Sequence, residues 1–295
     1  MVTRSRAVRL ALATLLVAVL AGCEYKTNVP VGDGPLRYRD EVFSTVTTTS
    51  NVVYGSAVGS SGSAQDLKLD LYQPAGDTNA KRPAIVWVHG GSFRTGSKTS
   101  AEIVDEAKTF AKKGFVTISI DYRLDPQGCS AGAPSAQCVT AIAWAKEDAQ
   151  AAVRWLRRYA STYKVDSTRI AIGGSSAGAI TALNVGYDED NPGSSGNPGY
   201  PSNVRAAISL SGSRIFGTVE KDDAWALLFH GTSDVVVPYA WAQSTLSGLK
   251  DAGVTAEATF WDGAGHVPYA AHRTEIIDQT TNFLWWSMGL GTAST

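Results

Sequence analysis

Apolar and polar positions follow two different patterns along the chain, and the change falls near residue 83. Before it, two β-branched and apolar stretches, 42–55 and 66–74, flank a Gly- and Ser-rich connection, which predicts a β-hairpin. After it, continuous apolar runs predict buried strands. These runs are 84–91, 115–124, 169–174, 204–212, 224–231 and 255–263.

Helical segments separate the buried runs. In the segment 100–114, Ile103, Ala107 and Phe110 fall on one side of a predicted helix that Gly114 ends. The other predicted helices are 141–163, 176–187, 239–253 and 272–289. Because continuous apolar strands that alternate with helices form parallel sheets covered on both faces, we expect an α/β fold with a mostly parallel central sheet.

The first 22 residues predict an export signal that is not part of the fold. Three arginines precede an apolar run from Leu10 to Ala21, which is short for a membrane span. The following "LAGC" resembles a bacterial lipobox, in which the cysteine, here Cys23, carries the lipid. The alternative is an ordinary secretory signal cut near the same place. The predicted segments are a signal peptide at 1–22, a flexible tether at 23–35 and one folded domain at 36–295.

Composition and charge limit the kinds of partner that the protein can bind and the places where it can act. The 295 residues are 44% hydrophobic, which suffices for one packed domain. The net charge is −1, and without residues 1–22 it becomes −4, with 23 basic and 27 acidic residues, so no basic surface favours nucleic acid. We expect the protein to lie in the bacterial cell envelope and to contact the membrane only through a lipid on Cys23. The alternative is plain secretion.

Cys129 and Cys138 lie nine positions apart in a segment rich in Gly, Pro, Ser and Ala. In an exported chain a disulfide between them is the default expectation, worth about 2–3 kcal/mol in the chain-entropy model. The alternative is a pair of free thiols. The sequence has no cluster of Cys and His with zinc spacing, so we expect no metal.

Two adjacent serines follow the predicted strand at 169–174. A nucleophilic hydroxyl at a sharp strand-to-helix turn needs small residues two positions before and after it, which gives the pattern G-x-S-x-G. Ser176 satisfies the pattern, whereas Ser175 does not. Ser130 also matches it, but it lies in a loop with Pro134 following, so no helix begins there. Ser176 is therefore the candidate nucleophile.

A glycine turn follows the strand residues 84–88. Backbone N–H groups that stabilise a developing oxyanion must approach the reacting atom closely, and glycine permits that approach. The sequence "HGGSF" resembles the H-G-G-G motif of lipases and esterases, with Ser92 at the last glycine. By position the expected donors are the N–H groups of Gly91 and Ala177, with Ser92 as a further candidate.

Asp234 comes just after the buried strand at 224–231, where a carboxylate can orient a histidine from a neighbouring loop. Asp222 and Asp223 precede their strand and so lie at the wrong end. Asp262 ends the last strand and is the competing candidate.

The chain has four histidines. His266 lies in a glycine loop after the last strand and follows both Ser176 and Asp234. His89 belongs to the glycine turn, and we expect His230 to be a hydrogen-bonded core residue and His272 to be solvated. The order Ser176, Asp234, His266 is the order of nucleophile, acid and base in strand–turn–helix hydrolases.

Residues 65–288 resemble the α/β-hydrolase superfamily in its serine esterase and lipase branch, near the hormone-sensitive-lipase-like and carbohydrate-esterase-like groups. "DYRL" at 121–124 and the stretch 152–179 are similar to those groups as well. The resemblance implies a serine hydrolase of small or short-to-medium acyl esters, with no cofactor. Alternatives are a prolyl-oligopeptidase-type peptidase, a polyester depolymerase, or a catalytically silent surface-binding protein of the same fold.

The loop at 186–204 is long for a compact domain, and long loops often carry function. We consider it as a lining of the substrate entrance. Its acids Asp188, Glu189 and Asp190 are candidates for cation binding, although solvated loop charge is the simpler interpretation.

Overall fold

The computed structural model describes residues 29, 34–130, 134–188 and 191–292. The predicted signal at 1–22 and the predicted lipidation of Cys23 lie outside these residues. Within the predicted tether, Val29 is buried, and its N–H donates to Asn282 Oδ1 at 3.2 Å. None of the helices in the described part of the chain is both long and apolar enough to cross a membrane.

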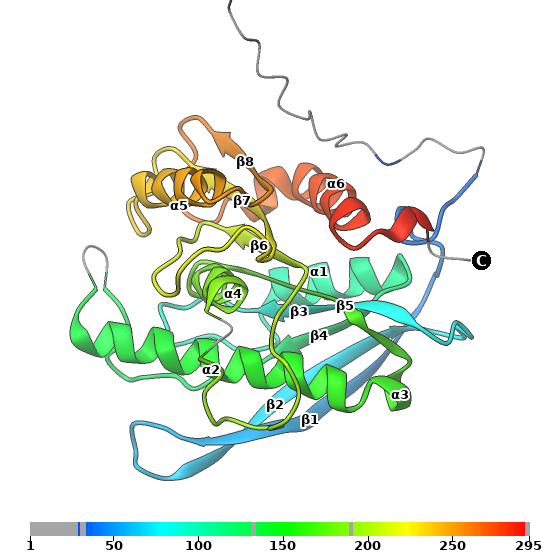
Figure 1. Ribbon diagram of the computed structural model, residues 1–295, viewed down its shortest axis with the longest axis horizontal. Helices are drawn as coiled ribbons and strands as arrows, with labels where there is room; N and C mark the ends of the chain where they lie inside the picture. The colour runs from blue at the N-terminus through cyan, green and yellow to red at the C-terminus, as the bar shows by residue number, and fades with distance from the viewer. Residues whose placement is uncertain (1–28, 30–33, 131–133, 189–190, 293–295) are drawn as a thin grey trace, which may run out of the picture.

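Eight strands form one sheet in the order β1–β2–β4–β3–β5–β6–β7–β8. β1 pairs antiparallel with β2 and β2 with β4, whereas all the other neighbours are parallel. Figure 1 shows the hairpin of β1 and β2 at one edge of the molecule and β7 and β8 toward the other. The strands are β1 (Val46–Val58), β2 (Ala64–Pro74), β3 (Arg82–Val88), β4 (Val116–Ile120), β5 (Val165–Ser175), β6 (Ala206–Leu210), β7 (Trp225–Gly231) and β8 (Ala256–Trp261). The predicted mostly parallel sheet is confirmed.

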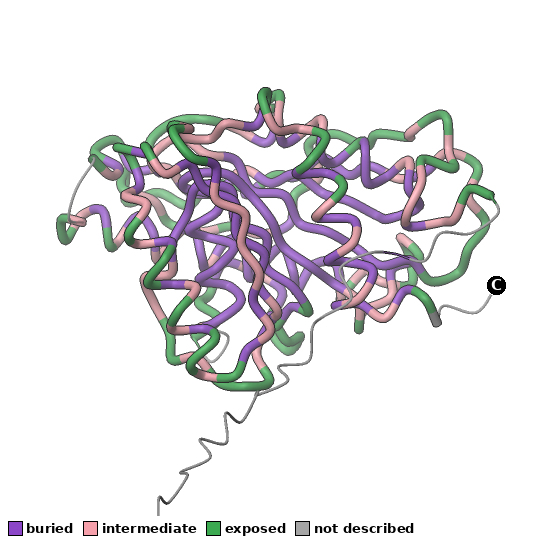
Figure 2. The backbone as a smooth tube through the Cα atoms, turned by 90° about the horizontal axis from the view of Figure 1, so that it is seen from above, coloured by how far each residue is buried: buried purple, intermediate pink, exposed green. Residues whose placement is uncertain are grey.

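Helices cover both faces of the sheet because buried side chains point alternately to the two sides of each strand. In β3, Val86 and Val88 belong to the core cluster on one face, which also includes residues of α2, α4 and α5, whereas Ile85 and Trp87 belong to the cluster on the other face, which includes residues of α1 and α6. Figure 2 shows that buried backbone, in purple, runs through the middle of the molecule. The helices are α1 (Ala101–Lys112), α2 (Ala136–Arg158), α3 (Ala160–Tyr163), α4 (Ala177–Tyr187), α5 (Tyr239–Asp251), α6 (Tyr269–Ser287) and the 3-10 turn η1 (Leu290–Thr292).

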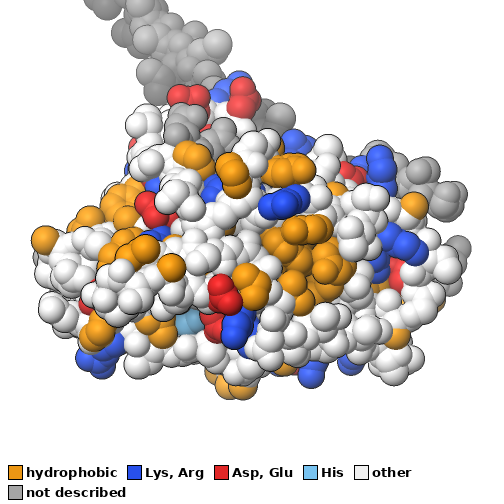
Figure 3. Space-filling model, turned by 90° about the horizontal axis from the view of Figure 1, so that it is seen from below, with side chains coloured by type: hydrophobic (Ala, Val, Ile, Leu, Met, Phe, Trp, Pro, Cys, Tyr) orange, Lys and Arg blue, Asp and Glu red, His pale blue; other side chains and the backbone are white. Residues whose placement is uncertain are grey.

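Charged side chains of both signs are scattered over the face shown in Figure 3, among uncharged and hydrophobic groups. This face therefore has no field of one sign. This mixture of charges agrees with the small net charge of −1.

The elements differ from the prediction mainly at their ends. The long helix α2 begins at Ala136 rather than 141, because Ser135 Oγ accepts a hydrogen bond from Cys138 N at 3.1 Å and caps the first turn. The closing helix α6 begins at Tyr269 rather than 272. Both strands of the hairpin extend into the Gly- and Ser-rich stretch, so the connection shrinks to residues 59–63.

The helix α4 lies against the sheet immediately after β5 because two glycines leave room for it. A Cβ atom on Gly178 would lie 2.0 Å from Val88 O, and one on Gly174 would lie 2.3 Å from the same oxygen. Both contacts are far shorter than van der Waals distance. The absence of these two side chains therefore fixes how closely the residue between them, Ser176, approaches β3.

The substitution Gly178→Ala should therefore destabilise the fold by about 1–3 kcal/mol, because the helix must move away from Val88 O. Urea unfolding of the variant measures this. Gly248→Ala in α5 is the matched control, since a Cβ there meets nothing within 4 Å and should stabilise by about 0.5–1 kcal/mol through better helix propensity. Equal effects of the two substitutions would contradict the packing argument.

Candidate active site

Ser176 lies at the bend between β5 and α4. Its backbone has φ 52° and ψ −118°, a left-handed conformation that non-glycine residues rarely adopt. Its N–H donates to Leu210 O at the end of β6 at 2.8 Å, and a Cβ on Gly90 would lie 3.2 Å from Ser176 Cβ. The strained bend is thus held between the carboxyl ends of β6 and β3.

His266 lies in the loop after β8 and contacts both other members of the predicted triad. Its Nε2 is 2.8 Å from Ser176 Oγ, and its Nδ1 is 2.7 Å from Asp234 Oδ2. The structure thus brings together Ser176, Asp234 and His266, which are up to 90 positions apart in sequence.

The carboxylate of Asp234 is fully buried and surrounded by donors. Oδ1 accepts from the N–H groups of Val236 and Val237 at 2.9 and 3.0 Å, and Oδ2 lies 3.2 Å from His230 Nε2 as well as against His266. Burial alone would raise the pKa of Asp234, but the hydrogen bonds from the two histidines and the backbone outweigh it and lower the pKa below its ordinary value. The carboxylate is therefore ionised at neutral pH.

An ionised Asp234 assigns the proton positions on His266. A carboxylate only accepts hydrogen bonds, so the proton of the neutral ring sits on Nδ1, and Nε2 is free to accept one from Ser176 Oγ. This arrangement makes the serine hydroxyl a candidate nucleophile with an adjacent base.

The competing residues lie elsewhere or make other contacts. Asp262 Oδ1 accepts from Thr232 Oγ1 at 3.1 Å. Asp223 Oδ2 accepts from Glu220 N, in the loop that precedes β7. Ser175 Oγ donates to Glu102 on α1.

The loop that carries His266 is fixed by contacts with the neighbouring strand ends. A Cβ on Gly231, the last residue of β7, would lie 2.2 Å from Ala264 O. Ser233 N donates to the same oxygen at 2.9 Å, and Val267 N donates to Ser211 Oγ at 3.0 Å. The glycine at the end of β7 thus lets the histidine loop approach the loop of Asp234.

The predicted oxyanion turn follows β3 in left-handed conformations. Gly91, Ser92 and Phe93 have φ values of 120°, 56° and 58°. Within the described residues the N–H groups of Gly91, Ser92 and Ala177 make no hydrogen bond to a backbone carbonyl. These groups therefore remain available to a ligand beside Ser176.

His89 precedes this turn and contacts its first glycine. Its ring stacks on Tyr122 at 4.3 Å between centroids, and its Nδ1 lies 2.6 Å from Gly90 O. Burial lowers the pKa of His89 and outweighs the opposing effect of the Gly90 carbonyl. The neutral ring is therefore favoured. His89 therefore has a structural role in the turn.

A cavity of about 50 Å³ opens beside Ser176. Its walls are mostly apolar and include the disulfide that joins Cys129 to Cys138, the pair expected from the sequence. The lining residues are Ser92, Phe93, Cys129, Ser130, Pro134, Cys138, Ile142, Ser176, Ala177, Ile180, Ile215, Val236, Val237 and Trp241.

Two residues of the site were not assigned there from the sequence. His230 was predicted as a hydrogen-bonded core residue, and its Nε2 does lie 2.9 Å from Val237 O, but it also contacts Asp234. Its position four residues before Asp234 was the available signal. Gly90 rather than Gly91 packs against Ser176. Outside the site, His272, expected to be solvated, is partly exposed and also stacks on Trp261, with 4.0 Å between the ring centroids.

The long loop after α4 does not line the cavity in its described part. Ser195 and Asn197 contact β1 and α2: Ser56 N donates to Ser195 O, and Asn197 Nδ2 donates to Tyr54 O and Ala151 O. Asp188 pairs with Lys146 of α2. Among the described residues no group of three or more His, Cys, Asp or Glu side chains is placed to hold a metal ion.

Comparisons with known proteins agree with this architecture. The family model described as BD-FAE matches residues 69–214, and the model described as TAP-like protein matches residues 209–285. Esterase 2 of Thermogutta terrifontis, solved after phosphorylation by paraoxon, is 25% identical and superposes with a TM-score of 0.67 over 84% of this chain and 96% of that one.

Curated relatives share shorter segments with this chain. Phenmedipham hydrolase of Pseudarthrobacter oxydans is 36% identical over 116 residues, which are 39% of this chain and 22% of that protein. Carboxylesterase 5A of Homo sapiens is 34% identical over 124 residues, which are 40% of this chain and 20% of that protein. The chain thus spans about a fifth of the length of these two relatives.

The geometry predicts that Ser176 is the reactive hydroxyl. A fluorophosphonate probe should label this residue, because its Oγ has the imidazole of His266 at 2.8 Å as a base. Peptide mapping by mass spectrometry locates the label, and Ser176→Ala should abolish it. A label on Ser175 or Ser130 would refute the assignment.

Proposed function

For this α/β-hydrolase we propose a function as a serine hydrolase that cleaves carboxylic esters through an acyl-enzyme. The observation that carries the proposal is the chain of contacts from Asp234 Oδ2 to His266 Nδ1 at 2.7 Å and from His266 Nε2 to Ser176 Oγ at 2.8 Å. The names of the relatives, a carboxylesterase and a phenmedipham hydrolase, support the same reaction class.

In the first step Ser176 Oγ attacks the ester carbonyl carbon, and His266 Nε2 takes the hydroxyl proton. Asp234 holds the ring and stabilises the imidazolium that forms. The negative charge on the carbonyl oxygen is stabilised by N–H groups of the turn, those of Gly91 and Ala177, with Ser92 as a further donor. The imidazolium then gives its proton to the leaving alcohol.

In the second step water attacks the acyl-enzyme while His266 takes a proton from it. The bond between the acyl carbon and Ser176 Oγ then breaks, His266 returns the proton to Oγ, and the acid is released. The reaction needs an acceptor base that is neutral before each attack. The ionised Asp234 meets this need by keeping the Nδ1 proton in place, so that Nε2 faces the reacting atoms.

The proposal predicts that Asp234→Asn lowers kcat for p-nitrophenyl acetate by about 10³–10⁴-fold, because the amide no longer selects the correct tautomer of His266. Steady-state kinetics and a melting curve of the purified variant measure the loss and the integrity of the fold. Asp262→Asn is the matched control and should keep nearly full activity, since Asp262 contacts Thr232 instead. A larger loss in the Asp262 variant would contradict the assignment.

A further inference from the structure

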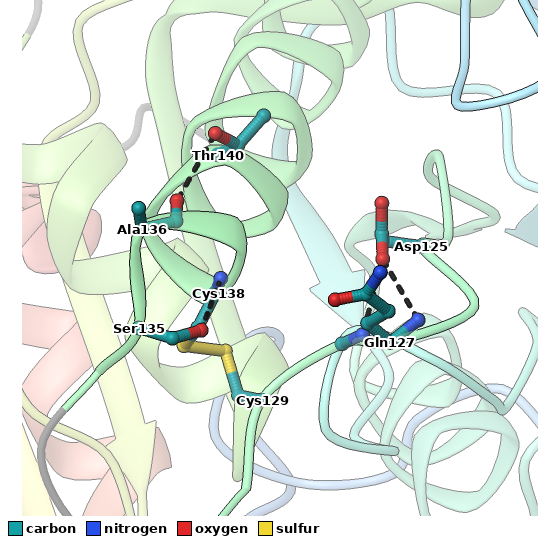
Figure 4. The surroundings of a disulfide bond; sticks show 8 residues. Asp125, Gln127, Cys129, Ser135, Ala136, Cys138 and Thr140 are labelled. Atoms are coloured by element: carbon teal, nitrogen blue, oxygen red, sulfur yellow. Dashed lines mark hydrogen bonds between the residues drawn. A yellow bond between two sulfur atoms is a disulfide. The ribbon is translucent and has the colours of Figure 1, made fainter.

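The Cys129–Cys138 disulfide joins two segments of the chain beside the site. Cys129 lies in the segment between β4 and α2, and Cys138 lies in the first turn of α2. Figure 4 shows the bond beside the capped start of this helix, with Asp125 and Gln127 a little earlier in the same segment as Cys129. The same segment also contacts the turn that follows β3.

Two backbone hydrogen bonds hold that turn. Cys129 N donates to Ser92 O at 2.8 Å, and Asp125 N donates to Phe93 O at 2.9 Å. Both acceptors belong to residues in the left-handed conformation, which the surrounding structure must stabilise. Cys129, one half of the disulfide, is therefore hydrogen-bonded to the turn that carries the candidate oxyanion donors.

Asp125 attaches the same segment to α2 a second time. Its Oδ1 accepts from the N–H groups of Gln127 and Gly128, at 2.8 and 3.2 Å, and its Oδ2 accepts from Gln137 Nε2 at 2.5 Å. The segment is thus fixed to the start of α2 by one covalent bond and one polar contact.

The disulfide is also part of the wall of the cavity beside Ser176. Cys129, Cys138 and Ile142 line it together with residues of α4 and α5. The cavity measures about 50 Å³, about a third of the roughly 150 Å³ of an engineered apolar cavity that binds benzene. The space therefore fits a group of about two or three carbon atoms.

The position of the base identifies which side of the ester this cavity receives. The leaving alcohol must be within reach of His266 Nε2, which gives it a proton. His266 is not among the residues that line the cavity, whereas Ser176 and Ala177 are. The acyl group, which stays bonded to Ser176, is therefore the part that enters.

We propose that the Cys129–Cys138 disulfide is a specificity-determining element that closes the acyl cavity and limits the substrate to esters of short acyl groups, acetyl or propionyl. This rests on the proposed ester hydrolysis at Ser176. Without the covalent bond the segment keeps only its hydrogen bonds to Ser92, Phe93 and Gln137, so it moves away from Ile142 more readily and opens the wall to longer chains.

The test compares kcat/KM for p-nitrophenyl acetate, butyrate and octanoate in the full chain and in the double variant Cys129→Ser, Cys138→Ser. The wild type should prefer acetate to octanoate by at least roughly tenfold, the effect that one methylene too many has in a closed apolar pocket. The double variant should lose most of that preference through a gain on octanoate.

A second variant keeps the test independent of the stability that the disulfide supplies. Ile142→Ala enlarges the same wall with the disulfide intact and should also raise the octanoate-to-acetate ratio about tenfold. Val139→Ala is the matched control: Val139 lies next to Cys138 in α2, is exposed, and does not line the cavity, so the ratio should stay at the wild-type value.

The outcomes separate this inference from the function on which it rests. If the wild type hydrolyses none of the esters, or Ser176→Ala keeps the activity, the proposed function fails and the inference fails with it. If the wild type hydrolyses acetate and octanoate equally well, or if Ile142→Ala and the double cysteine variant leave the ratio unchanged, the inference is overturned while ester hydrolysis stands.

Discussion

The hydrogen bond between the buried carboxylate of Asp234 and Nδ1 of His266 is the interaction on which the site depends. Burying an ionised carboxylate is costly unless donors surround it. Here the backbone N–H groups of Val236 and Val237, together with His230, supply these donors. The carboxylate consequently stays charged and its orientation is fixed, and that orientation determines which nitrogen of His266 faces Ser176.

The close approach of four loops at one edge of the sheet makes this hydrogen bond achievable. Parallel strands all present their carboxyl ends on the same edge, so the residues that follow β3, β5, β7 and β8 meet there. Their contact distance is set by glycines: Gly90 lies against Ser176, Gly178 against Val88, and Gly231 against the loop of His266. The strained φ of Ser176 is the local cost of this geometry, and the sheet holds it in place.

The sequence predicts features that depend on local patterns. The apolar runs, the glycines around Ser176 and the position of Asp234 after a strand are each visible in a few consecutive residues, and the predicted sheet with its hairpin follows from them. The start of α2 at Ala136 was missed because a helix cap had to be recognised inside a segment rich in Gly, Pro, Ser and Ala. The contact of His230 with Asp234, four residues later, had a local signal that was not used. The hydrogen bond from Cys129 N to Ser92 O arises only when distant segments pack, so no local pattern records it.

The central claim is that the turn after β3, the bend at Ser176 and the loop of His266 together form one site for a tetrahedral, negatively charged intermediate. The most direct measurement is a crystal structure of the protein after reaction with a short-chain alkyl phosphonate, whose adduct mimics that intermediate. The account predicts phosphorus bonded to Ser176 Oγ, with the phosphoryl oxygen about 2.7–3.1 Å from the N–H groups of Ala177 and the Gly91–Ser92 turn. An adduct on another residue, or a phosphoryl oxygen that points away from both groups, would contradict it.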